Sequence, residues 1–223
     1  MESTAKILAL IIAGLIIILA AAMTIAGLFY PAGFDYLGIT PESTYSYDVK
    51  ISSSSEIKDV AMFLPLPSSR DESPIGTVIS GGFGYGLKDL KPEIFGAKDS
   101  VMLKISADKI RDASFGAVSD AGAIINTQNY DSGSLLLSPV LNFSDNNRVS
   151  GYQTYIYAKY DADPDCRVDI FVTAKGENKW SFLTQKENSY TNYAHLTLTG
   201  PKSGWYEADA VAEYKNGDFS VSI

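Results

Sequence analysis

Three aspartates at alternate positions, Asp161, Asp163 and Asp165, carry the clearest chemical signal in the chain. Calcium-binding loops begin with this spacing, because oxygen ligands from alternate residues can converge on one cation. An EF-hand is not encoded, since its sixth position would be Cys166 and its twelfth Val172, where the motif needs glycine and glutamate. The cluster therefore predicts either an irregular calcium site, with no other cofactor, or a solvated acidic turn.

Nucleophilic catalysis has few candidate residues, because Cys166 is the only cysteine and His195 the only histidine. A Cys166/His195 pair could act as nucleophile and base. Cys166, however, alternates with Val168 and Ile170, and this register predicts a buried, inert thiol. The stretch Tyr130–Ser134 resembles a serine nucleophile loop but lacks the Gly-x-Ser-x-Gly pattern. We therefore expect no catalytic residues and no enzyme activity.

The segment Gly81–Gly86 contains four glycines together with Phe83 and Tyr85. No lysine and serine or threonine follow it, as a phosphate-binding loop requires, so we expect no nucleotide partner. The segment is better interpreted as a loop with two aromatic tips. We expect these tips to pack on the core of the domain, with contact to lipid or to a partner as the alternative.

Tyr155 and Tyr157 share one face of a predicted strand with Gln153 and Lys159. Paired tyrosines beside polar groups could form a flat binding surface for a sugar or a protein. The alternative is a strand that is covered on both faces. Separately, Asn142 begins the only Asn-x-Ser/Thr sequence and is a candidate glycosylation site in a glycosylating organism.

These residues must be positioned by β-strands, because apolar residues alternate with polar ones along most of the chain after Tyr30. The predicted strands cover residues 44–51, 60–66, 101–105, 152–160 and 166–174. With turn residues between the strands and no long amphipathic helix, this pattern predicts a mainly β fold, an antiparallel β-sandwich. Only Asp108–Ala113 is expected to form a short helix.

Two hairpins are predicted near the C-terminus. The first joins 205–215 to 218–223 through Asn216-Gly217, a pair suited to a type I′ turn. The second joins 170–174 to 180–183 through Lys175–Asn178.

The segments Leu198–Gly200 and Gly204–Tyr206 resemble the approach to a late strand of immunoglobulin-like domains, where a tyrosine holds the preceding corner. The resemblance covers fewer than ten residues and implies at most an outline of that fold.

Residues 7–29 form an unbroken apolar run without charge or proline, long enough to cross a bilayer as a helix. Because Lys6 precedes the run and acidic residues follow it, we expect residues 1–6 in the cytoplasm, 7–29 as a single transmembrane signal anchor, and 30–223 as an extracytoplasmic domain. A division of that domain near 142–151 is an alternative. So is a signal peptide cleaved after Ala20–Ala22.

The net charge is -8, from 18 Lys+Arg against 26 Asp+Glu, and it argues against a nucleic-acid partner. A single cysteine excludes an internal disulfide. Together these features predict a non-catalytic cell-surface domain that binds or organises an envelope polymer or another membrane protein.

There are two alternative functions. An apolar N-terminal helix followed by a β-domain is similar to the layout of pilin-like and archaellum-like subunits, although no basic leader precedes the helix and Glu2 lies before it. The other alternative is an exported, metal-assisted hydrolase that uses the carboxylates between Asp161 and Asp169.

Overall fold

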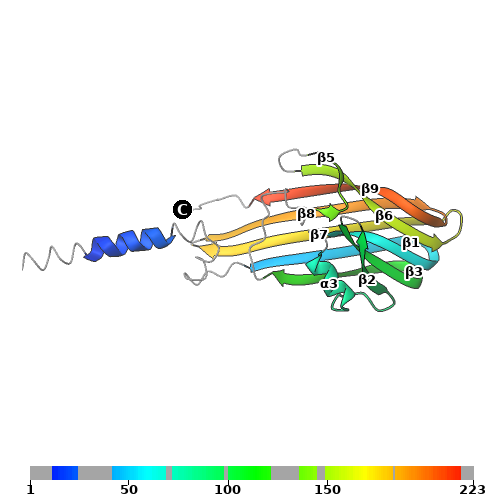
Figure 1. Cartoon of the computed structure of the whole chain (residues 1–223), viewed down its shortest axis with the longest axis horizontal. Helices are drawn as coiled ribbons and strands as arrows, with labels where there is room; N and C mark the ends of the chain where they lie inside the picture. The colour runs from blue at the N-terminus through cyan, green and yellow to red at the C-terminus, as the bar shows by residue number, and fades with distance from the viewer. Residues whose placement is uncertain are drawn as a thin grey trace, which may run out of the picture.

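The computed structural model describes residues 12–24, 42–68, 72–97, 100–121, 136–144, 149–182 and 184–216. Within these ranges the chain forms one nine-stranded sheet and the short helix α3, together with a helix over residues 12–24 (Figure 1). All strand pairs are antiparallel. The predicted mainly β, antiparallel fold is therefore confirmed.

The strands and the helix of the domain follow one another along the chain as β1 (Glu42–Pro67), α3 (Pro74–Ser80), β2 (Lys91–Ala97), β3 (Ser100–Ala121), β4 (Leu137–Ser138), β5 (Leu141–Ser144), β6 (Val149–Asp161), β7 (Arg167–Phe182), β8 (Thr184–Thr199) and β9 (Lys202–Asn216). The predicted strands 44–51, 60–66, 101–105 and 152–160 lie within these elements, and 166–174 begins one residue before β7. The predicted strands 44–51 and 60–66 are the two halves of β1.

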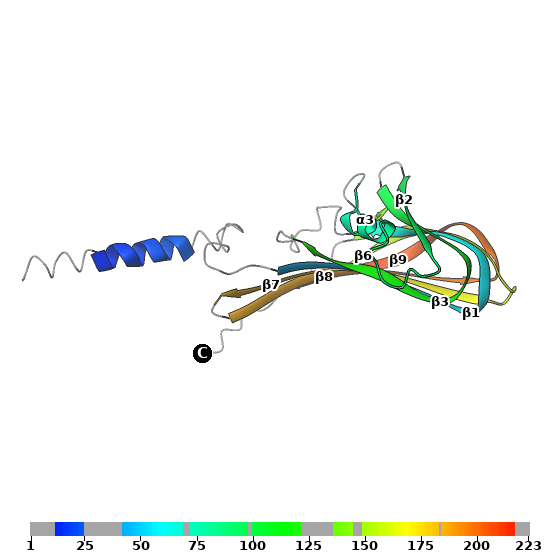
Figure 2. The ribbon, with the colours of Figure 1, turned by 90° about the horizontal axis from the view of Figure 1, so that it is seen from below.

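β1 bends sharply between its two halves. Its pairing with β3 shifts register between Ser52 and Ile57, and Asp59 has a φ of 52°. Bends of this kind let one strand continue from one layer of a β structure into another. Figure 2 shows the result, with β7 and β8 in one layer, β6 and β2 in the other, and the layers converging where β1 bends.

The sheet closes on itself through β1. Its first half pairs with β7, and its second half pairs with β6. Since β7, β8, β9 and β6 are hydrogen-bonded in that order, five strands form a closed ring. A β-sandwich implies two separate sheets, whereas the two layers here belong to one continuous sheet. Strands on either side of residues 142–151 share this sheet.

The interior between the layers is filled by the inward-facing residues of the ring strands, including Val49, Met62, Ile156, Ile170 and Ala210. α3 packs against this core through Ile75 and Ile79. Its start is capped by Ser73, whose side chain accepts a hydrogen bond from the Gly76 amide at 3.3 Å. The alternation seen in the sequence thus corresponds to one buried and one outward face along most of the strands. At Leu64–Pro67 and Val101–Leu103, successive residues are all buried.

Of the predicted membrane segment 7–29, residues 12–24 are helical, and the remaining positions lie outside the described residues. In both views this helix lies apart from the sheet (Figures 1 and 2). Among the residues that the structure describes, no helix meets the length and hydropathy needed to span a membrane.

Two local predictions are wrong. Lys175–Asn178 does not form a turn, because β7 continues to Phe182, which pairs with Thr184 of β8. Gly176 lies inside the strand, where the ring of Tyr190 packs over its Cα. The predicted helix Asp108–Ala113 is part of β3, since Ile110 pairs with Ile57 and is buried. The C-terminal hairpin cannot be compared, because residues 217–223 lie outside the described residues.

Candidate functional site

Five aromatic side chains gather on the outward face of the sheet and form what we call the aromatic patch: Phe63, Phe95, Tyr155, Tyr157 and Trp205. Trp205 is 50% exposed and Phe95 40%, and the other three are half-buried. Exposed groups of apolar side chains on a folded domain often mark a contact site.

Strand register brings the patch together. Tyr157 on β6 pairs directly with Phe63 on β1 and with Trp205 on β9. Each of the three alternates with residues that point into the core, such as Met62 and Ile156, so all three must point outward. Side chains of directly paired residues on one face lie close enough for their rings to touch.

The rings support one another across the strands. The ring centroid of Phe63 lies 4.7 Å from that of Phe95, 5.1 Å from that of Tyr157 and 5.9 Å from that of Trp205. Trp205 in turn lies 5.3 Å from Tyr157 and 6.4 Å from Tyr155. These separations are typical of edge-to-face and offset-stacked pairs, which restrict ring motion. The patch is therefore preorganised for binding.

Polar groups of both signs surround the patch. Lys104 pairs in register with Phe63, and its Nζ lies 2.6 Å from Oε2 of Glu93. Glu207 pairs in register with Tyr155 and is exposed, as is Lys159, two residues beyond Tyr157. These four described side chains at the rim of the patch offer two cations and two anions.

The structure brings together the two predicted binding residues, Tyr155 and Tyr157, through their shared contact with Trp205. Their strand is not covered on its outward face. The sequence analysis missed Phe63, Phe95 and Trp205. A signal was available for Phe63 and Trp205, because each occupies a position out of phase with the apolar residues of its strand.

The predicted metal ligands lie at the β6–β7 turn. Asp161 ends β6, Asp163 and Asp165 lie in the turn, and all three are exposed. The Cys166 amide donates to the Asp163 carbonyl at 3.0 Å, which closes the turn. Among the described residues, no three His, Cys, Asp or Glu side chains are grouped as metal ligands. A calcium site here stays a prediction. It would be supported if calcium raises the melting temperature of the protein and Asp163→Ala abolishes that rise.

Cys166 and His195 do not form a catalytic pair. The thiol is buried, as predicted, and lies 3.7 Å from the Ser55 carbonyl oxygen. His195 lies on the outward face of β8, where its ring stacks on Phe171 at 4.1 Å.

His195 instead neighbours a carboxylate. Its Nε2 lies 3.5 Å from Oδ1 of Asp169, which also accepts a hydrogen bond from Thr197 at 2.6 Å. This bond, together with Arg167, holds the pKa of Asp169 below its usual value. The ionised carboxylate of Asp169 thus accepts hydrogen bonds from Thr197 and Arg167.

The aromatic tips of the Gly81–Gly86 loop do not enter the core, contrary to our expectation. Phe83 is 84% exposed, and Tyr85 is exposed while its backbone pairs with Gly116 of β3. Positive φ angles at Gly82 and Gly86 direct the loop outward.

Asn142, the predicted glycosylation site, lies exposed on β5, where its Nδ2 donates to Oε1 of Gln153 at 2.7 Å. Tyr130–Ser134 lies outside the described residues.

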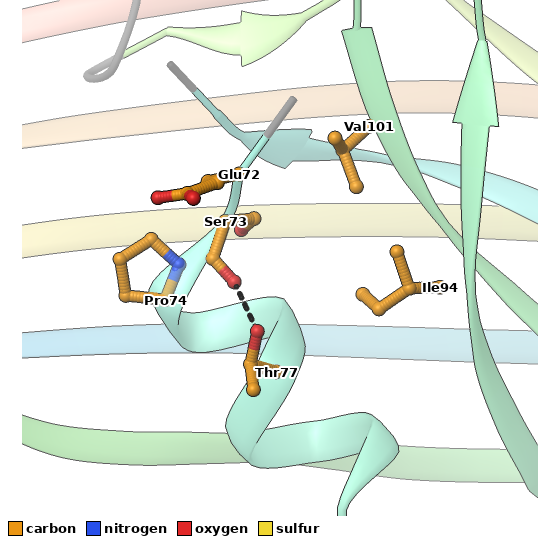
Figure 3. Close-up of a pocket in the computed structure, with 6 residues that line it drawn as sticks. All are labelled: Glu72, Ser73, Pro74, Thr77, Ile94 and Val101. Carbon is orange, nitrogen blue, oxygen red and sulfur yellow. Dashed lines mark hydrogen bonds between the residues drawn. The ribbon is translucent and has the colours of Figure 1, made fainter. Parts of the chain in front are cut away.

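A pocket of about 230 Å³ lies at the start of α3 (Figure 3). Its lining residues are Glu72, Ser73, Pro74, Thr77, Ile94 and Val101. Two of its polar side chains are engaged within the protein, since Thr77 Oγ1 donates to the Ser73 carbonyl and Ser73 Oγ to the Pro67 carbonyl. The third, Glu72, is exposed. The pocket thus offers one carboxylate beside two engaged hydroxyls, whereas the aromatic patch gathers five side chains, and we take the patch as the stronger candidate site.

Comparisons with protein-family models, with curated proteins and with solved structures find no match.

Proposed function

We propose that the protein is a non-catalytic cell-surface domain, anchored in the membrane by residues 7–29, that binds an extracytoplasmic partner through its aromatic patch. The N-terminus is cytoplasmic and residues 30–223 lie outside the cell. The partner is an envelope polymer or another membrane protein. The aromatic patch is the observation that carries this proposal.

The helix over residues 12–24 supports the membrane anchor. Its large apolar side chains are exposed on all sides, among them Ile12, Leu15, Ile16, Ile17, Ile18 and Leu19. A helix that is apolar around its whole circumference needs an apolar environment, and the apolar sequence continues beyond the described positions at both ends. A bilayer supplies that environment.

The sheet supports a binding role. In the described strands the inward faces are packed. The aromatic patch, by contrast, exposes apolar side chains to water, which is unfavourable in free energy. Aromatic residues are enriched where proteins contact their partners, because they contribute large area with little conformational entropy.

Protease shaving of intact cells tests the anchor, with an epitope placed after Ile223 and the mature N-terminal residue determined from the same sample. We expect loss of the epitope and a membrane-retained fragment that begins at Met1 or Glu2. An epitope that survives on intact cells but not on permeabilised ones contradicts the orientation. A mature chain that begins near Met23 contradicts the anchor and identifies a released protein.

Sedimentation with purified cell envelopes tests the binding role, using the full chain in lipid nanodiscs. We expect Tyr157→Ala/Trp205→Ala to lower the sedimented fraction. Tyr193→Ala is the matched control, because Tyr193 is also exposed but lies on β8, outside the aromatic patch. Equal sedimentation of all three proteins would refute a binding role for the patch.

A further inference from the structure

We propose that the aromatic patch is a binding site for the sugar rings of an uncharged polysaccharide. This assignment rests on the binding role proposed above and names the chemical class of the ligand. Three properties of the patch lead to it: its size, the packing of its rings into one compact cluster, and the balance of charge around it.

The size of the patch fits a small number of sugar rings better than a protein. An aromatic side chain offers roughly 150–250 Å² in total, so five that are half exposed or less present on the order of 400 Å². A stable protein interface buries about 800 Å² on each partner. The exposed charged groups next to the patch, such as Glu207 and Lys159, would have to be desolvated to enlarge it to that area.

The arrangement of the rings suits a pyranose. One face of such a ring carries mainly C–H groups, which are attracted to the negative face of an aromatic ring. Phe63, Tyr157 and Trp205 lie on three adjacent strands. Their ring centroids form a compact triangle with sides of 5.1, 5.3 and 5.9 Å. One sugar unit of a polysaccharide could therefore contact more than one ring of this cluster, in which Trp205 is the most exposed.

The rim supplies the hydrogen bonds that sugar hydroxyls need and indicates that the ligand is uncharged. Glu207 accepts and Lys159 donates, while Glu93 and Lys104 already neutralise one another at 2.6 Å. These four side chains together carry no net charge, so they favour neither sign of ligand charge. Single-stranded nucleic acid would also stack on such rings, but it needs an electropositive groove, and the chain has a net charge of -8.

Titration calorimetry tests this proposal, using the full chain in lipid nanodiscs and neutral hexasaccharides built from glucose, N-acetylglucosamine, mannose or galactose. We expect at least one hexasaccharide to bind, and Tyr157→Ala and Trp205→Ala each to weaken its affinity by about tenfold or more. Tyr193→Ala should bind as the unmodified protein does. Thermal melting confirms that each variant is folded, which is expected because the substituted rings are partly exposed.

Binding that survives both patch substitutions would place the sugar elsewhere and overturn the proposal. If no hexasaccharide binds while Tyr157→Ala/Trp205→Ala still lowers sedimentation with envelopes, the sugar assignment falls and the binding role of the patch stands. If neither sugars nor envelopes respond to the substitutions, both fall. Patch-dependent binding to protein-free lipid vesicles, without sugar binding, would identify the patch as a lipid contact instead.

Discussion

The hydroxyl of Tyr47 joins the two layers of the domain. It donates to the carbonyl oxygen of Pro65 at 3.0 Å, so it connects the two halves of β1 across the interior. Tyr47→Phe would leave that buried carbonyl without this donor, and we expect a loss of about 1–2 kcal/mol in the free energy of unfolding. Urea denaturation of the detergent-solubilised full chain measures it. Tyr193→Phe, at an exposed position, should change little.

Alkaline pH should destabilise the domain. Burial raises the pKa of Tyr47, Tyr152 and Tyr190 above the ordinary tyrosine value, which is about 10. Below that pH these tyrosines are neutral in both states, and their contribution to stability is complete. Above it the unfolded chain loses protons that the folded chain retains, so the free energy of unfolding falls. Urea midpoints that stay constant from pH about 8 to about 11 would contradict this expectation.

Gly176 should not tolerate a side chain. A Cβ at this position would lie 2.3 Å from Cε1 of Tyr190, whose ring is fully buried and cannot move aside. We expect Gly176→Ala to cost about 1–3 kcal/mol of stability through overpacking. Gly151→Ala is the matched control, because a Cβ added there would have no neighbouring atom within 4 Å and the position is exposed. Equal melting temperatures for the two variants would refute the argument.

The candidate site could be predicted from the sequence only in part. Tyr155 and Tyr157 were identifiable because both lie on one strand, out of phase with its apolar residues. Their contacts with Phe63 and Trp205 were not, since these depend on the register between strands far apart in the sequence. Alternation determines which face a side chain occupies but not which residue lies beside it on the next strand.

The bend of β1 depends on a residue in the left-handed region. Asp59 has a φ of 52° and is exposed. Aspartate and asparagine tolerate this conformation, whereas a β-branched side chain is strained there. We expect Asp59→Val to lower the free energy of unfolding by about 1–2 kcal/mol. Asp59→Asn should leave it nearly unchanged, and a comparable loss in both variants would indicate a role for the charge instead. Urea denaturation distinguishes these outcomes.

The elements themselves were predictable where alternation was strict, as along β6 and β7. Prediction failed where local turn signals competed with tertiary packing. Gly176 and its polar neighbours are typical of a turn, yet Tyr190, distant in sequence, packs on that glycine and keeps the strand continuous. The sequence of the Ser52–Glu56 segment indicates a loop between two strands. In the structure, hydrogen bonds such as that from Ser53 Oγ to the Arg111 carbonyl hold this segment within one bent strand.

At the scale of the whole molecule, closure of the sheet could not be predicted. It depends on β1 pairing with both β6 and β7, which no local pattern encodes. The apolar core, the antiparallel strands and the apolar N-terminal segment all follow from composition and periodicity. The way in which two layers become one ring follows from a single bend.

β1 also determines how the protein would respond to mechanical force. Its first half follows the segment proposed as the anchor and is hydrogen-bonded on both sides, to β3 and to β7. Phe63, at the aromatic patch, lies on the same strand beyond the bend. Where a bound polymer is held at Tyr157 and Trp205, on other strands, tension from the membrane would enter along β1 and load its ladders in shear. Many hydrogen bonds would have to break together before the strand slipped, as a load-carrying tether requires.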